Sequence, residues 1–293
     1  MKYRKIKIII SFFYLALLGL KKYLLLAVGK RIPGRFLVLY YHSVKDGEKE
    51  DFARQMHCLH RMSKPVAASY SGEIPPGKVY TAITFDDGFR NIVKYAVPEL
   101  IKLNIPFTVF LPSEFLSKYP GWKANEKFTD FGEMIMGPED VSALPKKLAL
   151  VGSHSVSHGV MTGMSQSEAA SEMTRSKEYL KSVSGRKVEM FSFPYGEFNK
   201  NLVNVALKAG YKRIFTNKPE VLLRTADSFI IGRIKADPTD SPLEFKLKIA
   251  GAYGWLKGVE YLKEKLKIGK KQFQPHNKQG VERALEGEKI SVL

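Results

Sequence analysis

Hydrophobic segments of two kinds alternate through the middle of the chain. Short runs rich in β-branched and aromatic residues are typical of strands, and longer stretches with an apolar residue every three or four positions are typical of helices. Strands are predicted at 35–41, 79–85, 105–111, 148–153, 188–193, 212–216 and 229–234. Helices are predicted at 50–62, 91–104, 165–185 and 201–211. This alternation predicts an α/β fold with a parallel sheet and helices outside it, either open or closed into a barrel.

Two of the predicted helices carry recognisable end signals. Ser165 is followed three positions later by Glu168, the pattern of a capping box at a helix start. Gly185 and Gly210 stand where a glycine commonly ends a helix. The segment 112–138 is long and irregular, so we expect a functional loop or an insertion there.

The first 30 residues form a separate segment that is both apolar and basic. An apolar run of thirteen residues at 8–20 is followed by Lys21, Lys22 and a second short run at 23–28. Thirteen residues fall short of the roughly 20 that cross a bilayer, and no small-residue cleavage pattern of a secretory signal follows. We therefore expect residues 1–30 to be a retained membrane anchor or an interfacial helix. The alternative is a helix packed on the soluble domain.

The other end of the chain is basic as well. Apolar residues recur at mostly helical spacing among many lysines from 241 to 271, which predicts a basic amphipathic helix or helix pair. It can dock on the domain or on anionic headgroups. Residues 272–293 read as a polar tail, which leaves one domain at 35–240.

The charge of the chain points to anionic partners. The sequence holds 47 Lys and Arg against 29 Asp and Glu, a net charge of +18. Such a balance favours nucleic acid, an acidic membrane surface or an acidic polymer. No zinc-finger, helix-turn-helix or RNP-like pattern is present, so we do not expect a nucleic-acid partner. A single cysteine, Cys58, excludes an internal disulfide framework.

Polar clusters follow three of the predicted strands. The first is Asp86-Asp87-Gly88, the second is GSHSVSHG at 152–159, and the third is FSFPYGEFN at 191–199. The C-terminal ends of parallel strands share one face of the sheet, where ligands bind. We therefore expect the three clusters to converge in space.

The residue types in these clusters suit a metal site. His154 and His158 are four residues apart, which puts two nitrogen ligands on one side of a helical turn, and Asp87 can add an oxygen ligand. Adjacent residues that leave a strand point in different directions, so one acid can bind a cation while the other acts as a general base. Taken alone, Asp86 and Asp87 read as a solvated turn and the histidine pair as a chance spacing. Together they indicate catalysis.

The ordered set TFDDG, HSVSH and FPYG resembles the motifs of the NodB-homology polysaccharide deacetylases, carbohydrate esterase family four. The resemblance runs from about 37 to 236 and includes the softer features LYYHSV, KAGYKRIFT and IGRIKAD. It implies an irregular, partly open, TIM-like (β/α) barrel with about seven parallel strands. To this fold the ends of the chain would add the apolar N-terminal helix and the basic C-terminal helix.

The resemblance also implies residue roles. Asp87, His154 and His158 would bind a divalent metal ion, and Asp86 would be the general base toward the water that this ion holds. The backbone N–H of Tyr195 and the metal would stabilise the oxyanion that forms when the water attacks an acetamide carbonyl. A general acid would then protonate the leaving amine, so that acetate and a free amino sugar result.

Two positions depart from the family pattern. The family often carries an arginine before its Pro-Tyr pair, where this chain has Ser192 or Phe193; Arg233 in IGRI could supply that role. The family's C-terminal Leu-x-His motif is absent, and only His276 in the tail follows the last strands. The front segment LYYH resembles that motif in a permuted order, as in a subgroup resembling the biofilm poly-N-acetylglucosamine deacetylases. We therefore predict His42 as the general acid; the alternative is that it only caps a strand end.

These features predict a metal-dependent hydrolase that removes N-acetyl groups from an amino-sugar polysaccharide or a glycolipid. Zinc is the expected ion, and two histidines with a carboxylate also suit cobalt and nickel. We expect a membrane-associated protein of the cell envelope. The alternatives are a hydrolase of another non-peptide C–N amide and a catalytically dead carbohydrate-binding module.

Overall fold

The computed structural model describes residues 2–122, 130 and 132–262 of the chain. The chain divides into two compact units, Met1–Trp255 and Leu256–Leu293. In the second unit the described residues, 256–262, are helical. The first unit holds all the named elements and the candidate site.

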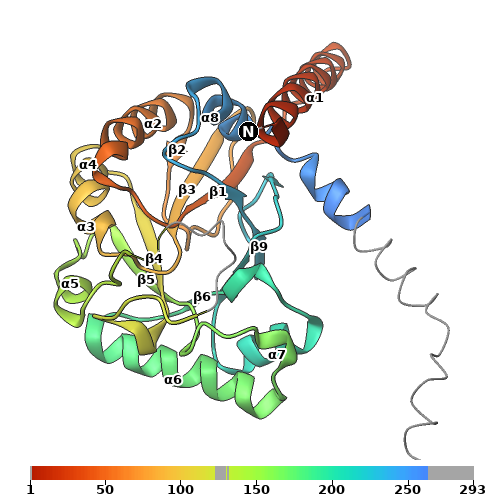
Figure 1. Cartoon of the computed structure of the whole chain (residues 1–293). Coiled ribbons are helices and arrows are strands. Elements are labelled where there is room, and N and C mark those ends of the chain that lie inside the picture. Colours follow the sequence, from red (N-terminus) through yellow and green to blue (C-terminus); the bar gives the residue numbers. More distant parts are fainter. Residues whose placement is uncertain (1, 123–129, 131, 263–293) are drawn as a thin grey trace, which may run out of the picture. The chain divides into compact units, whose positions relative to one another are not determined.

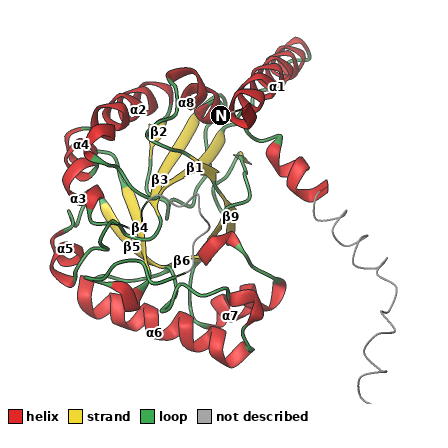
Figure 2. Ribbon diagram, in the orientation of Figure 1, coloured by secondary structure: helices red, strands yellow, loops and turns green. Residues whose placement is uncertain are grey.

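A single curled sheet forms the centre of the first unit (Figures 1 and 2). Its neighbouring strands follow the order β10-β1-β3-β4-β5-β6-β7-β9 and are parallel throughout, while β2 pairs with β3 and β8 lies antiparallel to β1. The strands are β1 (Arg35–Tyr41), β2 (Lys64–Pro65), β3 (Val79–Phe85), β4 (Phe107–Leu111), β5 (Ala149–Ser153), β6 (Met190–Ser192), β7 (Arg213–Thr216), β8 (Leu222–Leu223), β9 (Ile230–Gly232) and β10 (Ile234–Lys235).

The sheet confirms the predicted α/β fold with a partly open barrel. Each of the seven predicted strands is present, and the last, predicted at 229–234, is divided at Arg233 into β9 and β10. These two short strands lie at opposite ends of the strand order. The chain therefore passes from one end of the curled sheet to the other through a single residue, Arg233.

Helices cover the outside of the sheet, as Figure 1 shows for α2 to α7. The helices are α1 (Lys2–Ala27), α2 (Lys49–Met62), α3 (Asn91–Tyr95), α4 (Val97–Lys102), α5 (Pro138–Ala143), α6 (Gln166–Ser184), α7 (Lys200–Lys208) and α8 (Pro242–Ile249). Short 3-10 turns occupy Asp46–Glu48, Ser113–Phe115, Met161–Gly163 and Pro194–Gly196.

The end signals in the sequence act as predicted. The Ser165 side chain accepts a hydrogen bond from the Glu168 backbone N–H at the start of α6, and Gly185 ends that helix with φ 63°. The segment predicted as one helix at 91–104 forms two, α3 and α4, which meet at Ala96. Pro98 lies in the first turn of α4 and has no N–H to continue the α3 hydrogen-bond ladder.

The core lies between the sheet and its helices. All five residues of β4 are buried, and so is every residue of β3 after Val79. Such near-continuous burial is expected of parallel strands that are covered on both faces. The strand ends that carry the polar clusters are consequently fixed by the packing of the strands behind them.

The two chain ends differ in detail from the sequence expectation. Helix α1 runs from Lys2 to Ala27, well beyond the apolar run 8–20, and is the one helix among the described residues that is long and apolar enough to cross a membrane. Helix α8 starts the predicted C-terminal helical segment but ends before Gly251, which has φ 75°. A second helical stretch begins at 256; residues 263–271 and the predicted tail 272–293 lie outside the described residues.

Candidate active site

The polar clusters converge at the C-terminal ends of three strands. Asp86 and Asp87 follow β3, His154 follows β5, and the turn Pro194–Gly196 follows β6. Asp87 has φ 65° and Gly88 also has φ 65°, so the chain turns sharply as it leaves β3. A Cβ at Gly88 would lie 2.1 Å from Leu111 Cδ2, and the turn therefore requires glycine.

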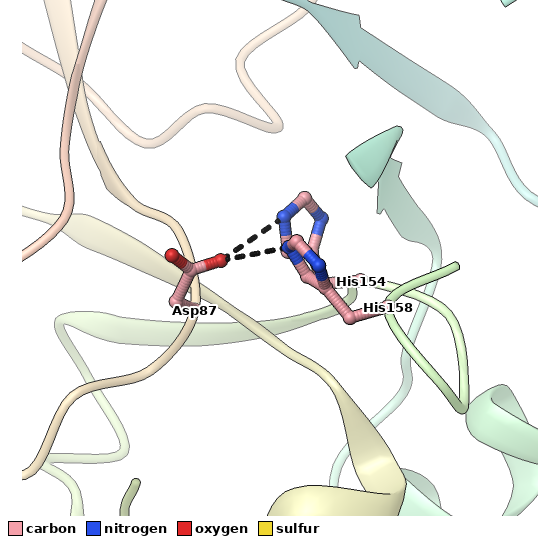
Figure 3. A group of neighbouring side chains, drawn as sticks. All are labelled: Asp87, His154 and His158. Carbon is pink, nitrogen blue, oxygen red and sulfur yellow. Dashed lines mark ion pairs between the residues drawn. The ribbon is translucent and has the colours of Figure 1, made fainter. Parts of the chain in front are cut away.

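Asp87 faces both histidines of the second cluster (Figure 3). Its Oδ1 lies 3.4 Å from His154 Nε2 and 3.1 Å from His158 Nε2, and all three side chains are buried. Two ligand atoms of a tetrahedral zinc ion are separated by about 3.3 Å when each lies about 2.05 Å from the ion. The two nitrogens and one oxygen therefore fit a divalent metal ion.

The two histidine rings are oriented in different ways. His154 donates from Nδ1 to the Ser192 carbonyl oxygen at 2.7 Å, which directs Nε2 at Asp87. His158 Nδ1 has no hydrogen-bond partner among the described residues. Its ring instead stacks on Trp122, with centroids 4.0 Å apart, and meets the edge of the Tyr195 ring at 4.9 Å. Aromatic packing therefore holds the His158 ring in place.

Helix α6 fixes the loop that joins the two histidines. Ser155 and His158 both have positive φ, 68° and 55°, a conformation that costs free energy in residues other than glycine. Between them, the backbone N–H groups of Val156 and Ser157 each donate to Glu172 Oε2 at 2.9 Å. Glu172 therefore positions the histidine loop, a role that no sequence pattern on α6 indicates.

Asp86 is held by Arg233, which lies between β9 and β10, the strands at the two ends of the strand order. Arg233 donates from its two terminal nitrogens to the two carboxylate oxygens, each at 2.7 Å. Its side chain is fully buried, with the guanidinium 4.7 Å from the Tyr40 ring centroid. Its remaining polar contacts are with Thr84 Oγ1, Ser192 Oγ, Asn217 Oδ1 and the Thr216 carbonyl. The residue expected to replace the family's arginine thus lies against the predicted base.

The electrostatics of the two acids follow from these partners. Burial by itself raises the pKa of Asp86, but the Arg233 charge and its hydrogen bonds outweigh burial and lower that pKa. Burial also opposes ionisation of Asp87, yet the hydrogen bonds with His154 and His158 hold its pKa well below the usual range. Both acids are consequently ionised at neutral pH.

The pKa values of the two histidines shift in opposite directions. Burial lowers the pKa of His154, but the hydrogen bond with Asp87 and the charges of Asp86 and Asp87 outweigh burial and raise this pKa above the ordinary histidine value. For His158 burial dominates and the pKa is lowered, which favours the neutral ring that metals bind.

The remaining predicted residues lie at the same end of the barrel. His42 follows β1, is half-buried with its ring centroid 5.7 Å from that of Tyr40, and contributes to the electrostatic potential at both Asp86 and Asp87. Tyr195 is 41% exposed and has φ 59°. The structure therefore brings all seven predicted site residues together, and it adds Trp122, Glu172 and Asn217, which sequence reasoning missed.

Three buried donor atoms that could hold a metal ion, beside a second, arginine-bound carboxylate, suit a hydrolase that activates water. Comparison with known proteins gives the particular class. Residues 73–214 match the family model of polysaccharide deacetylases. The chain is 24% identical over 232 residues to YxkH of Bacillus subtilis (strain 168), which carries the name of a polysaccharide deacetylase; the match covers 75% of this chain and 76% of that protein.

Solved structures share the fold. IcaB from Ammonifex degensii is 23% identical with a TM-score of 0.62, and the match covers 75% of this chain and 97% of IcaB. The deacetylase PplD of Streptococcus pyogenes, solved in complex with acetate, is 19% identical with a TM-score of 0.60, and the match covers 74% of this chain and 99% of PplD. Residues 73–214 therefore form a polysaccharide deacetylase domain, and the chain is an enzyme of this class.

Proposed function

We propose that the protein is a metal-dependent hydrolase that removes N-acetyl groups from an amino-sugar polymer or a glycolipid. The observation that carries this proposal is the different surroundings of two adjacent carboxylates. Asp87 faces two histidine nitrogens, whereas Asp86 is paired with Arg233. Binding of a glycan alone would not require a second, arginine-held acid beside a metal site.

Asp87, His154 and His158 would hold the ion, for which zinc is the first candidate; cobalt and nickel accept the same ligands. An ion bound there would polarise the acetamide carbonyl and make a coordinated water more acidic. The hydrogen bond from His154 Nδ1 to Ser192 keeps the Nε2 lone pair available to it.

Asp86 would accept the proton of the attacking water. Arg233 keeps this carboxylate ionised and fixes its plane, because a guanidinium carries a permanent charge and matches both oxygens at once. Each carboxylate oxygen has more than one lone pair, so the pair with Arg233 leaves acceptor capacity for water.

His42 would protonate the leaving amine, and the backbone N–H of Tyr195 would donate to the developing oxyanion. Their placement supports both roles: the His42 ring lies against Tyr40, whose ring also contacts the Arg233 guanidinium, and the Tyr195 ring contacts that of His158. Bound acetate in PplD, the acid that N-deacetylation releases, is consistent with this reaction.

We further propose that α1 attaches the enzyme to a membrane of the cell envelope. The most apolar 18-residue stretch of this helix, within 3–27, has a mean hydropathy of 1.8, and 6% of that stretch is buried. The net charge of +18 favours an anionic membrane surface over a neutral one.

Acetate release from N-acetylglucosamine oligomers tests the function. The enzyme should release acetate, lose this activity after treatment with a chelator, and regain it on addition of zinc. Glycan binding without acetate release would indicate a dead binding module. Release of another acid from a different amide would indicate the alternative hydrolase.

A further inference from the structure

Helix α1 is joined to the catalytic unit by an ion cluster that the candidate active site does not use. Arg4 in its first turn donates to Glu244 Oε2 at 2.6 Å, to Asp240 Oδ1 at 3.1 Å and to the Thr239 carbonyl at 2.6 Å. The Asp240 and Glu244 side chains are only 3% and 5% exposed. Lys248 on α8 pairs with both of them. We call these four charged residues the Arg4 cluster.

The charges of the cluster balance only when α1 is present. Asp240 and Glu244 carry two negative charges and Lys248 one positive charge, so Arg4 brings the sum to zero. A buried charge without a counter-charge strongly destabilises a fold. Arg4 therefore supplies part of the counter-charge that the buried Asp240 and Glu244 require.

A second contact lies two turns further along α1. The Trp255 indole N–H donates to Ser11 Oγ at 2.9 Å, and Ser11 is fully buried although its neighbours on α1 are not. Half-buried Arg4, Ile8, Leu15 and Leu18 fall on the same side of the helix as Ser11, and with Ser11 they form a series at spacings of three or four. The side of α1 that carries Arg4 and Ser11, here called the docked side, therefore contacts the catalytic unit in the first half of the helix.

The opposite side of α1 is apolar and exposed. Ile6, Ile9, Phe13, Leu17, Leu20 and Leu24 follow one another at spacings of three or four and are 44% to 66% exposed. The helix has no acidic residue, and its cations stand near its two ends, up to Lys7 and from Lys21 onward. We call this the outward face of α1.

We propose that α1 is a permanent part of the folded enzyme and that its outward face lies in the interfacial plane of an anionic lipid bilayer, without crossing it. This inference rests on the proposed membrane attachment and specifies its geometry. Arg4 and Ser11 hydrogen-bond to the catalytic unit, so the first half of a docked α1 cannot have lipid on every side. A cleaved signal sequence would leave the Arg4 cluster with an excess negative charge.

The charge decides between a bilayer and a second copy of the chain as the occupant. A second copy would bring the same cationic helix ends and the same excess of positive charge, and like charges oppose its approach. Anionic headgroups would instead pair with the lysines at both ends while the apolar residues between them enter the acyl boundary.

Vesicle binding of the full-length protein tests the outward face. The double variant Phe13→Glu, Leu17→Glu should bind vesicles of phosphatidylcholine with phosphatidylglycerol at least about 10-fold more weakly than the wild type. The control variant Ile101→Glu, Leu207→Glu changes exposed apolar residues on α4 and α7 and should bind normally. Alkaline carbonate should release the wild type from native membranes. The proposal would be overturned if the wild type resists carbonate or if the double variant binds vesicles as the wild type does. It would also be overturned if the double variant loses a dimeric state but keeps vesicle binding.

Two variants that remove the same charge test the docking. Arg4→Ala should lower the thermal midpoint by about 5 °C, whereas Lys5→Ala, at an exposed position of the same helix, should not. If Arg4→Ala does not fold, Trp255→Phe should give a smaller decrease through the lost bond to Ser11. Equal midpoints for the Arg4 and Lys5 variants, or an intact mass of the membrane-derived protein that lacks 1–27, would contradict the docked helix.

Turnover of a soluble oligosaccharide tests the deacetylase activity separately from the membrane geometry of α1. The Phe13→Glu, Leu17→Glu variant should keep wild-type turnover while it loses vesicle binding. If the wild type binds vesicles but releases no acetate, the deacetylase proposal fails and the membrane geometry stands.

Discussion

Asp86 and Arg233 form an ion pair with two hydrogen bonds of 2.7 Å, although 147 residues separate them along the chain. Arg233 stands at the single residue between β9 and β10, where the strand order passes from one end to the other. The pair fixes Asp86, while the next residue, Asp87, turns at φ 65° toward the histidines. One sharp turn thus gives two adjacent acids different partners.

Replacement of Arg233 by lysine should move the acid limb of the pH–activity profile. The pKa of Asp86 is lowered in the wild type, so this base is ionised through the neutral range and activity is lost only as pH falls through that lowered pKa. A single ammonium cannot engage both oxygens, burial then raises the pKa, and the acid limb of kcat/KM should rise by about 1–3 pH units. Asn217→Ala removes another Arg233 partner and should leave the limb in place. An unmoved limb in Arg233→Lys would show that the pair does not set it.

The Asp86→Asn variant should separate metal binding from catalysis. It retains Asp87 and both histidines, so elemental analysis should find the full metal content, while kcat should fall about 10²- to 10⁴-fold. It also leaves the Arg233 guanidinium buried without a carboxylate, which should reduce the free energy of unfolding by about 3–5 kcal/mol. Asp227→Asn, at an exposed position, should change neither quantity. Unchanged acetate release in Asp86→Asn would refute the base assignment.

Removal of either histidine should abolish stoichiometric metal binding. His154→Ala or His158→Ala deletes one of the three buried donors, and two remaining ligands bind zinc much more weakly than three. The measurement is metal content per protein after dialysis against buffer without metal. His60→Ala, on the exposed side of α2, is the control and should retain the ion. A full equivalent of metal in either site variant would place the ion elsewhere.

Glu172→Ala should weaken metal binding although Glu172 is not a ligand. Without its oxygen, the N–H groups of Val156 and Ser157 lose their acceptor and the strained histidine loop is free to relax. We expect an affinity loss of about 10- to 100-fold in chelator competition, with a smaller effect on the stability of the metal-free protein. Glu178→Ala, six residues further along the same helix at an exposed position, should have no effect on affinity. Equal affinities would assign Glu172 to packing alone.

The role of His42 can be tested by changing the leaving group. The His42→Ala variant should retain metal and lose about 10²- to 10⁴-fold in kcat on an N-acetyl amino sugar, whose amine must be protonated to leave. An aryl acetate has a leaving group that needs no proton, so its hydrolysis should be much less affected. Equal losses on both substrates would mean that His42 does not act as the acid.

Much of the fold follows from local patterns. The seven apolar runs and the caps at Ser165 and Gly185 predict the strands and α6 because period-two and period-3.6 burial and helix-end hydrogen bonds are properties of short segments. The same locality explains the errors in detail. The break at Ala96 between α3 and α4 and the division of the last strand at Arg233 depend on single residues within otherwise regular patterns.

The candidate site likewise combines features that local sequence predicts with contacts that depend on how the elements pack. Local patterns alone predict that Asp86, Asp87 and His154 directly follow strands and that His158 lies in the loop after one, and parallel strands bring such residues to one face. The sequence offered Arg233 only as a candidate partner of the base, and its pairing with Asp86 is seen only in the folded chain. The contacts of Glu172 with the histidine loop and of Arg4 with α8 had no sequence signal at all. Each of these contacts joins residues whose separation along the chain carries no periodic signal. Their partners are set by which elements pack together, and charged side chains are accepted in those interiors only where the fold supplies the opposite charge or a hydrogen-bond donor.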